Sequence, residues 1–253
     1  MSNRAEQRRE AREQGGSDMT KFYWVFGAVA VIGVGSFMYS MGANTFGTAA
    51  SEPIEIEGLD DMGTLAELAQ GVTKGDPAAP ITIVEFADYQ CPGCGAFALS
   101  VKPQIDLMYV QTGKAKFVYY DFPLISIHGH SFLAARAGRC AADQDKFWEY
   151  QDQLFRNQAN WAADQAPMGK FLDYAGAVEM DEDAFEGCVK SDRHADVVSA
   201  NMRLAYELGI DGTPTVMISG GGGMARRLNN FDFQSIQTVV EELLATLEEP
   251  VGN

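Results

Sequence analysis

The fold is decided by the stretch Ile81-Thr82-Ile83-Val84-Glu85-Phe86-Ala87-Asp88-Tyr89-Gln90-Cys91-Pro92-Gly93-Cys94. Its first six residues are mostly apolar and β-branched, which is typical of a buried strand. The residues after Cys94 suit a helix, so the cysteines lie where a strand passes into a helix. Free N–H groups and the dipole at a helix N-terminus favour a thiolate at Cys91, and Cys94 lies within disulfide reach. The pattern predicts redox chemistry.

A zinc site is the alternative interpretation of Cys91-Pro-Gly-Cys94, since C-x-x-C is also half of a structural zinc site. Such a site needs two more ligands at compatible spacing. The sequence has no second C-x-x-C, and Cys140 and Cys188 are far apart. His128 and His130 form only an isolated H-x-H pair. We therefore favour the redox interpretation and predict no metal site.

Composition limits the classes of partner. The chain has 253 residues, of which 46% are hydrophobic, enough for one substantial core and roughly one domain. Its formal net charge of -16 argues against a nucleic-acid partner. A diffuse acidic surface is explained by solubility alone, so the charge does not predict a basic substrate.

Residues 22–51 contain no charged side chain, and residues 22–41 are almost wholly apolar or small. About 20 such residues span about 30 Å as a helix, enough to cross a bilayer. Basic residues precede this segment and acidic residues follow it, so the positive-inside rule places the N-terminus in the cytoplasm. We predict a transmembrane anchor over 22–43. The alternative is a cleaved signal peptide, because Thr48-Ala49-Ala50 offers small residues at a plausible cut site.

The rest of the chain is predicted to form one α/β unit. Strands are expected at 81–87 and 116–120 with a helix between them, kinked at Pro103. A helical block follows, and then two short strands at 215–218 and 224–228 precede a terminal helix at 233–248. The predicted divisions are a cytoplasmic tail (1–21), the anchor (22–43), a tether with a short helix at 64–69 (44–75), and α/β segments before (76–126) and after (209–250) a helical insertion (127–208).

Four separated motifs carry a family resemblance. They are residues 75–94, Asp121-Phe-Pro-Leu124, Asp145-Lys-Phe-Trp-Glu-Tyr150 and Gly212-Thr-Pro-Thr215. In this order they resemble the DsbA-like thiol:disulfide oxidoreductases of the thioredoxin superfamily, over residues 75–248. The resemblance implies a thioredoxin fold with an inserted helical subdomain, here preceded by one transmembrane helix.

The resemblance also implies roles for individual residues. Cys91 would be the exposed nucleophile and Cys94 the buried resolving cysteine. Pro214 would be a cis-proline facing the disulfide, with Thr213 touching the active sulfur and binding a substrate backbone beside Pro92 and Gly93. The physics agrees, because X-Pro is the one peptide bond where cis is accessible at low cost. The alternative for Thr213-Pro214 is an ordinary loop proline.

Glu85 lies six residues before Cys91, in the middle of the apolar strand. In the family, an acid at the matching position tends to relay a proton for the buried cysteine, and burial would raise its own proton affinity. We predict this role for Glu85. Strict alternation along the strand leaves open a glutamate that faces solvent.

Two departures from the family limit what the resemblance carries over. The dipeptide between the cysteines is Pro92-Gly93, without the histidine that stabilises the thiolate in some relatives, so their strongly oxidising character is not transferred. Tyr120 stands where relatives often have arginine, which leaves the partner of Asp121 open.

Cys140 and Cys188 lie 48 residues apart within the insertion. In an oxidising compartment the simplest interpretation is a structural disulfide, worth about 4 kcal/mol in the chain-entropy model. Two free buried cysteines and a second redox pair remain as alternatives. His128 and His130 are predicted to be capping or surface residues, and His194 to be exposed to solvent.

The function predicted from these features is that of a thiol:disulfide oxidoreductase anchored by a single span in the inner membrane, with its catalytic domain on the periplasmic side. Its partners would be cysteine-containing client polypeptides and a membrane redox protein of the DsbB or VKOR type, and no dissociable cofactor is implied. The alternatives are a reductase or isomerase, for example for cytochrome maturation, a client-binding chaperone without turnover, and a metal-delivery protein.

Overall fold

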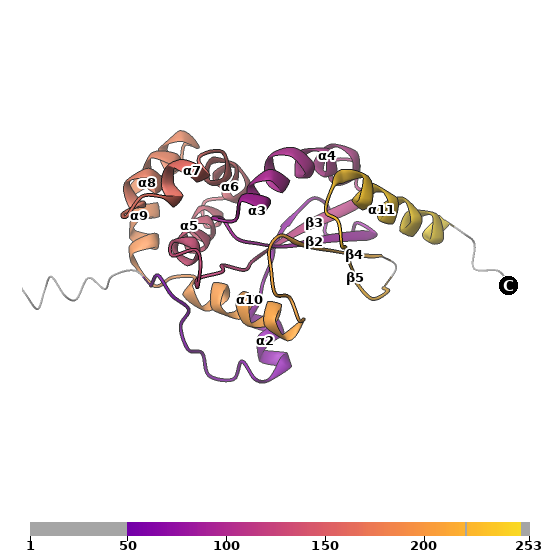
Figure 1. Cartoon of the computed structure of the whole chain (residues 1–253), viewed down its shortest axis with the longest axis horizontal. Coiled ribbons are helices and arrows are strands. Elements are labelled where there is room, and N and C mark those ends of the chain that lie inside the picture. The colour runs from indigo at the N-terminus through magenta and orange to yellow at the C-terminus, as the bar shows by residue number, and fades with distance from the viewer. Residues whose placement is uncertain (1–49, 221, 249–253) are drawn as a thin grey trace, which may run out of the picture. The chain divides into compact units, whose positions relative to one another are not determined.

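The sheet has five strands in the order β1-β3-β2-β4-β5 (Figure 1). The computed structural model describes residues 50–220 and 222–248. Strands β2 and β3 are parallel, and the other pairs are antiparallel. The strands are β1 (Val72–Lys74), β2 (Ile81–Ala87), β3 (Ala115–Asp121), β4 (Thr215–Gly220) and β5 (Arg226–Arg227). Strands β2 to β5 correspond to the four predicted strands of a thioredoxin-like fold, with the last one shorter than the predicted 224–228, and β1 was not predicted.

A helical segment connects β2 to β3 and runs from Pro92 to Val110, close to the predicted helix. It comprises α3 (Pro92–Ala96), a π turn η1 (Phe97–Val101), α4 (Lys102–Ile105) and a second π turn η2 (Asp106–Val110). Lys102 follows the first π turn and its N–H bonds to the Phe97 carbonyl, and Pro103 comes next. The wider π bonding adjusts the backbone ahead of a proline that has no N–H to donate.

Six helices separate β3 from β4, within the predicted insertion. They are α5 (Ser131–Ala142), α6 (Phe147–Arg156), α7 (Gln158–Ala162), α8 (Met168–Ala177), α9 (Glu182–Lys190) and α10 (Ala195–Glu207). Helix α10 packs against β3, whereas α11 (Phe233–Glu248) packs against β2 and β4. Figure 1 shows α10 on the opposite side of the sheet from α4 and α11. Both sides of the central strands are therefore covered.

The segment predicted as a tether contributes structure to this unit. Helix α2 (Met62–Leu68) is capped by Asp61, whose carboxylate accepts a hydrogen bond from the Thr64 N–H, and the helix packs on α10. Strand β1 pairs with the outer edge of β3. Helix α2 corresponds to the short helix predicted at 64–69. Strand β1 was not predicted within the tether, because a three-residue strand is too short to give a periodic signal.

The predicted transmembrane anchor at 22–43 lies outside the described residues. Within residues 50–220 and 222–248, no helix has both the length and the apolar character needed to cross a membrane.

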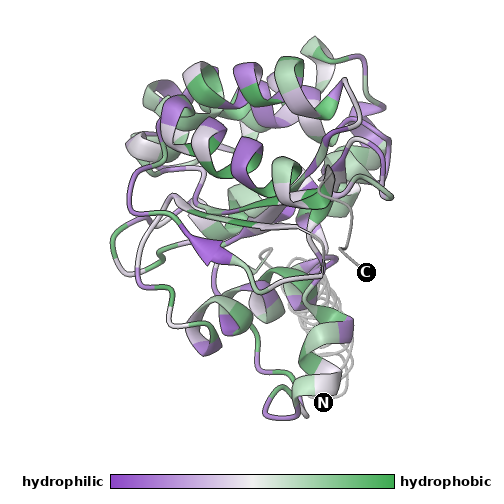
Figure 2. Ribbon diagram, turned by 90° about the vertical axis from the view of Figure 1, so that its right-hand side faces the viewer, coloured by the Kyte–Doolittle hydropathy of each residue, from purple (hydrophilic) through white to green (hydrophobic). Residues whose placement is uncertain are grey.

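The sheet and the insertion share one hydrophobic core. Aromatic contacts join them: Tyr89, after β2, stacks on Phe155 of α6 at 5.0 Å, and Tyr119 of β3 meets Phe147 at 5.6 Å. Figure 2 shows hydrophobic and hydrophilic residues alternating along the helices, as expected for helices packed on one side only. The insertion therefore supports the segment that leads from β2 to the cysteines.

Asp121 finds its ionic partner in this insertion. The sequence left that partner open because Tyr120 replaces the arginine of many relatives. In the structure Arg139 of α5 reaches the fully buried Asp121 carboxylate, with 2.6 Å between Nη2 and Oδ2. A cation from a neighbouring helix thus pairs with the acid at the end of β3.

Candidate active site

The two cysteines lie at the carboxyl end of β2. The chain leaves the strand at Ala87 and makes a turn in which the Cys91 N–H donates to the Asp88 carbonyl at 3.1 Å. Helix α3 then begins at Pro92, with Cys91 in the N-cap position. Proline suits this position, because the first N–H groups of a helix have no partner within it. Cys91 is therefore held at a helix N-terminus, as predicted, and both cysteines are thiols.

The Thr213-Pro214 segment, just before β4, faces these cysteines. Its peptide bond is cis, and the Thr213 carbonyl oxygen lies 3.3 Å from Cys91 Sγ. A Cβ at Gly93 would lie only 3.1 Å from Pro214 Cδ, so the glycine allows the close approach. The structure thus brings together the residues that the sequence assigned to the site.

Cys91 is set up as a thiolate. Hydrogen bonding from the Cys94 thiol, followed by Thr213 and the backbone amides of Cys94 and Gly93, lowers the pKa of Cys91 to about 5 although burial opposes this shift. These donors stabilise the charged form of the sulfur. At neutral pH the nucleophilic form therefore dominates at Cys91.

Cys94 has the opposite character. Burial raises the pKa of Cys94, and the neighbouring Cys91 and Glu85 raise it further. Glu85 lies beneath the cysteines with 1% of its surface exposed, and burial raises its pKa to about 8, with Lys102 opposing the shift. Its carboxyl faces the fold interior rather than solvent. A group with this pKa can carry a proton at neutral pH.

Lys102 is a buried cation that the sequence analysis missed. Its Nζ lies 2.9 Å from Asp106 Oδ2 and 4.7 Å from the centre of the Trp148 ring. Burial lowers the pKa of Lys102, whereas Asp106 raises it. The i, i+4 spacing of Lys102 and Asp106 was visible in the sequence, but it is equally common on exposed helix faces.

Three further residues of the site were not predicted. His128 was expected to be a cap or surface residue, yet its Nδ1 lies 2.8 Å from Oδ2 of the buried Asp88. From α7, the Gln158 amide donates to the carbonyls of Tyr89 and Cys91, at 2.7 and 2.9 Å. Only the tertiary fold brings the side chains of His128 and Gln158 to the turn at residues 88–91, so no local sequence pattern predicted these contacts.

Cys140 and Cys188 form a disulfide between α5 and α9, with 5.9 Å between their Cα atoms. This rules out the alternative of two free cysteines. Asp143 lies beside it and accepts from His194, with 3.0 Å between Oδ2 and Nε2, so His194 is partly buried rather than fully exposed. His194 and the two sulfurs lie within 4.8 Å of one another, but the disulfide leaves His194 as the free ligand of the three.

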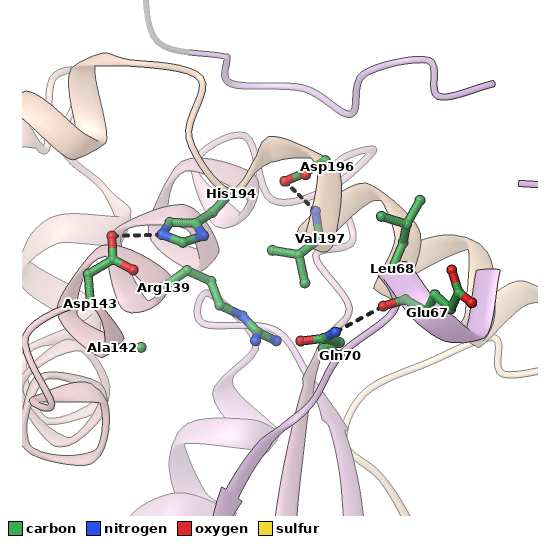
Figure 3. A pocket seen from close by; sticks show the side chains of 9 residues that line it. All are labelled: Glu67, Leu68, Gln70, Arg139, Ala142, Asp143, His194, Asp196 and Val197. Atoms are coloured by element: carbon green, nitrogen blue, oxygen red, sulfur yellow. Dashed lines mark hydrogen bonds and ion pairs between the residues drawn. The ribbon is translucent and has the colours of Figure 1, made fainter. Parts of the chain in front are cut away.

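A surface cavity of about 340 Å³ lies elsewhere, between α2, α5 and α10 (Figure 3). Its lining includes Glu67, Arg139, Asp143 and His194. None of the catalytic candidates lines it. The cavity is therefore separate from the cysteine site. At that site Cys91, expected to be exposed, has only 8% of its surface accessible.

Comparison with known proteins gives consistent matches. A family model described as Thioredoxin matches residues 67–240. Disulfide bond formation protein D of Bacillus subtilis is 27% identical over 194 residues, covering 73% of this chain and 84% of that protein. The crystal structure of oxidised BdbD from Bacillus subtilis is similar with a TM-score of 0.61 and 26% identity, covering 68% of this chain and 92% of that one.

A different kind of protein also matches. The Na(+)/H(+) antiporter NhaA 3 of Salinispora tropica is 29% identical over 164 residues, which cover 65% of this chain. That segment is only 24% of the antiporter, so the chain spans about a quarter of its length.

Proposed function

Because the chain belongs to the thioredoxin family, among its DsbA-like thiol:disulfide oxidoreductases, we propose that it introduces disulfides into client polypeptides through Cys91 and Cys94. The single observation that carries the direction is the placement of Cys91 at the N-terminus of α3, where hydrogen bonds lower the pKa of Cys91 to about 5. A stabilised thiolate favours the reduced state of the pair, which makes the Cys91–Cys94 disulfide a stronger oxidant. Oxidation of clients is therefore favoured over the reductase or isomerase alternative.

The proposed reaction begins with the Cys91–Cys94 disulfide. A client thiolate attacks Cys91 Sγ and forms a mixed disulfide, while Cys94 leaves as a thiolate and takes up a proton. The second client thiolate then attacks the client sulfur, and Cys91 leaves as the stabilised thiolate. Two client thiols are oxidised and one enzyme disulfide is reduced.

Glu85 is the proposed proton carrier for the step in which Cys94 leaves. It is buried, its pKa is raised to about 8, and it acts electrostatically on Cys94. At neutral pH a carboxyl of this kind holds a proton that a newly formed neighbouring thiolate can accept. The proton then returns to Glu85 or to solvent when the disulfide is formed again.

The client backbone is proposed to lie along Thr213 and Pro214. Pro92 is exposed and Gly93 is partly exposed beside them, so a peptide held there has access to Cys91. An extended segment would pair with the backbone before β4 as an added strand. Backbone pairing of this kind is independent of client sequence, which suits an enzyme that acts on many polypeptides.

Membrane anchoring is part of the proposal and rests on the sequence of residues 22–43. An uncleaved anchor would hold the catalytic unit on the periplasmic side of the inner membrane. There a membrane protein of the DsbB or VKOR type would restore the Cys91–Cys94 disulfide by accepting its two electrons. Extraction of the full chain with alkali and with detergent distinguishes an integral from a released protein.

The decisive experiment is an equilibrium titration of the full chain against glutathione, with Cys140 and Cys188 followed separately by alkylation and mass measurement. We expect a reduction potential well above the about −270 mV of thioredoxin and towards the about −120 mV of strong oxidants. A value near about −270 mV, as for thioredoxin-type reductants, would reverse the proposed direction. Absence of any reversible Cys91–Cys94 disulfide would favour a client-binding module without turnover.

A further inference from the structure

Asp88 holds both cysteines through its backbone. Its carbonyl oxygen accepts from the Cys91 N–H at 3.1 Å, and its own N–H donates to Cys94 Sγ at 3.4 Å. The second contact directs a backbone N–H at the sulfur that leaves when a client attacks Cys91, and that attacks a mixed disulfide at Cys91 when the pair is re-oxidised. Any residue that fixes the orientation of Asp88 therefore acts on Cys94.

The Asp88 carboxylate is itself held from three directions. It is 1% exposed, and its Oδ1 accepts from the Gln90 N–H at 2.7 Å. Its Oδ2 accepts from the Leu124 N–H at 2.7 Å and lies 2.8 Å from His128 Nδ1. A carboxylate only accepts hydrogen bonds, so His128 Nδ1 must carry the proton. Within residues 50–220 and 222–248, His128 is the side chain that bonds to this carboxylate.

We propose that His128 is a positioning residue: by holding the Asp88 carboxylate it keeps the Asp88 N–H directed at Cys94 Sγ and thereby speeds the attack of Cys94 on a mixed disulfide. This inference rests on the proposed function and deepens it. The thiolate is the attacking species, and an N–H donor stabilises it. Burial raises the pKa of Cys94, so a larger thiolate fraction outweighs the accompanying loss of nucleophilicity.

The attack of Cys94 can be measured separately from the first attack by Cys91. The probe is an aromatic disulfide, dithiobis(nitrobenzoate), added to the full-length chain with Cys91 and Cys94 reduced. Cys91 thiolate attacks the probe, forms a mixed disulfide and releases one coloured thiolate. Cys94 thiolate then attacks Cys91 Sγ, forms the Cys91–Cys94 disulfide and releases the second. In total, the two protein thiols lose two electrons, which reduce one probe disulfide to two thiolates. Their two protons are released to solvent. Alkylation and mass measurement verify that Cys140–Cys188 stays closed.

Three variants test the inference. For His128→Ala we expect the second phase to slow by about twofold to tenfold, the kinetic equivalent of one hydrogen bond, with the first phase unchanged. In His128→Asn the side-chain amide can replace the Nδ1 donor, so the second rate should return to within about twofold of the parent. His130→Ala is the matched control, a histidine of the same loop whose backbone N–H bonds to Gln90.

Several outcomes would overturn the inference. An unchanged second phase in His128→Ala, equal slowing of both phases, or failure of His128→Asn to restore the rate each contradict it. His128→Ala should slow the second phase less in the Asp88→Asn background than in the parent protein, because both substitutions act through the same His128–Asp88 contact. Near-ultraviolet circular dichroism verifies that each variant is folded. Because the probe replaces clients, these rates stay readable even if client oxidation fails.

Discussion

The two cysteine pairs of this chain are chemically identical, but the residues around them have opposite effects on their sulfur atoms. Cys91 and Cys94 lie at a helix N-terminus, where hydrogen bonds lower the pKa of Cys91 to about 5. Cys140 and Cys188 join two helices across 48 residues, and the Asp143 carboxylate lies 3.7 Å from Cys188 Sγ. A negative charge beside a sulfur disfavours a thiolate. The surroundings of the first pair therefore favour thiol–disulfide exchange, and those of the second favour a disulfide that stays closed.

The comparison also shows what each pair closes. The first spans a single helical turn, so its disulfide removes little entropy from the unfolded chain. The second links α5 to α9 across 48 residues and removes more. We infer that the first pair serves reactivity and the second stability.

The largest expected effect is on catalysis. Cys91→Ser should lower the rate of oxidation of a reduced dithiol peptide on the order of a thousandfold or more, because it removes the attacked sulfur. The double variant Cys140→Ala with Cys188→Ala should keep the rate within about threefold, since its mutations lie away from the reacting atoms. A peptide carrying two cysteines and a fluorophore reports the rate. Comparable losses in both variants would contradict the division of roles.

The next effect is on stability. Cys140→Ala with Cys188→Ala should lower the free energy of unfolding by about 4 kcal/mol, the chain-entropy value for this loop. Urea unfolding of the oxidised proteins measures it. The matched control is Cys91→Ser with Cys94→Ser, whose short loop limits the loss to at most about 2 kcal/mol. The stabilised Cys91 thiolate reduces this loss further, because it favours the open pair. A larger loss in the control would reverse the comparison.

How much of this was predictable differs between the two regions. The strand, the helix start, Cys91, Cys94 and Glu85 lie within one short stretch, so local pattern and resemblance located them. Fold class followed from the order of elements. Strand β1 and the π turns were missed because three residues carry no period and π bonding has no composition of its own.

The supporting side chains could not be predicted for a different reason. His128, Gln158 and Arg139 reach their partners only after the insertion has packed on the sheet. In the sequence each is an ordinary polar residue at a helix or loop. Contacts between residues tens of positions apart leave no local signature, so the parts of the site that tune reactivity were the hardest to find.

A third prediction concerns Glu85 and pH. Its folded pKa of about 8 lies above the ordinary value of 4.5, so its contribution to stability is fully present below about pH 4.5 and is lost as pH rises to about 8. The parent should lose roughly 3 kcal/mol of unfolding free energy between pH 4 and pH 7 because of Glu85, whereas Glu85→Gln should not show this loss. Urea unfolding across this range measures the difference. The control is Glu149→Gln, an exposed carboxyl of α6, for which a flat difference is expected.

The smallest effect tests whether the two regions communicate. Gln158, in the insertion, donates to the carbonyls of Tyr89 and Cys91, and so ties the region stabilised by Cys140–Cys188 to the reactive turn. Gln158→Ala leaves both carbonyls without this donor. We expect a loss of about 1 to 2 kcal/mol in unfolding free energy, and a change of about twofold to fivefold in the rate at which Cys91 is alkylated.

Gln104→Ala is the matched control, because the Gln104 amide also donates to a carbonyl, that of Ser100, but on the exposed face of α4. A surface bond of this kind contributes under about 0.5 kcal/mol. If both variants behaved alike, the insertion would support the site through its hydrophobic core alone. If only Gln158→Ala changed the alkylation rate of Cys91, then the Gln158 amide would couple the insertion, which Cys140–Cys188 stabilises, to the reactive turn. The structural disulfide would then support the reactivity of Cys91 as well as the stability of the fold.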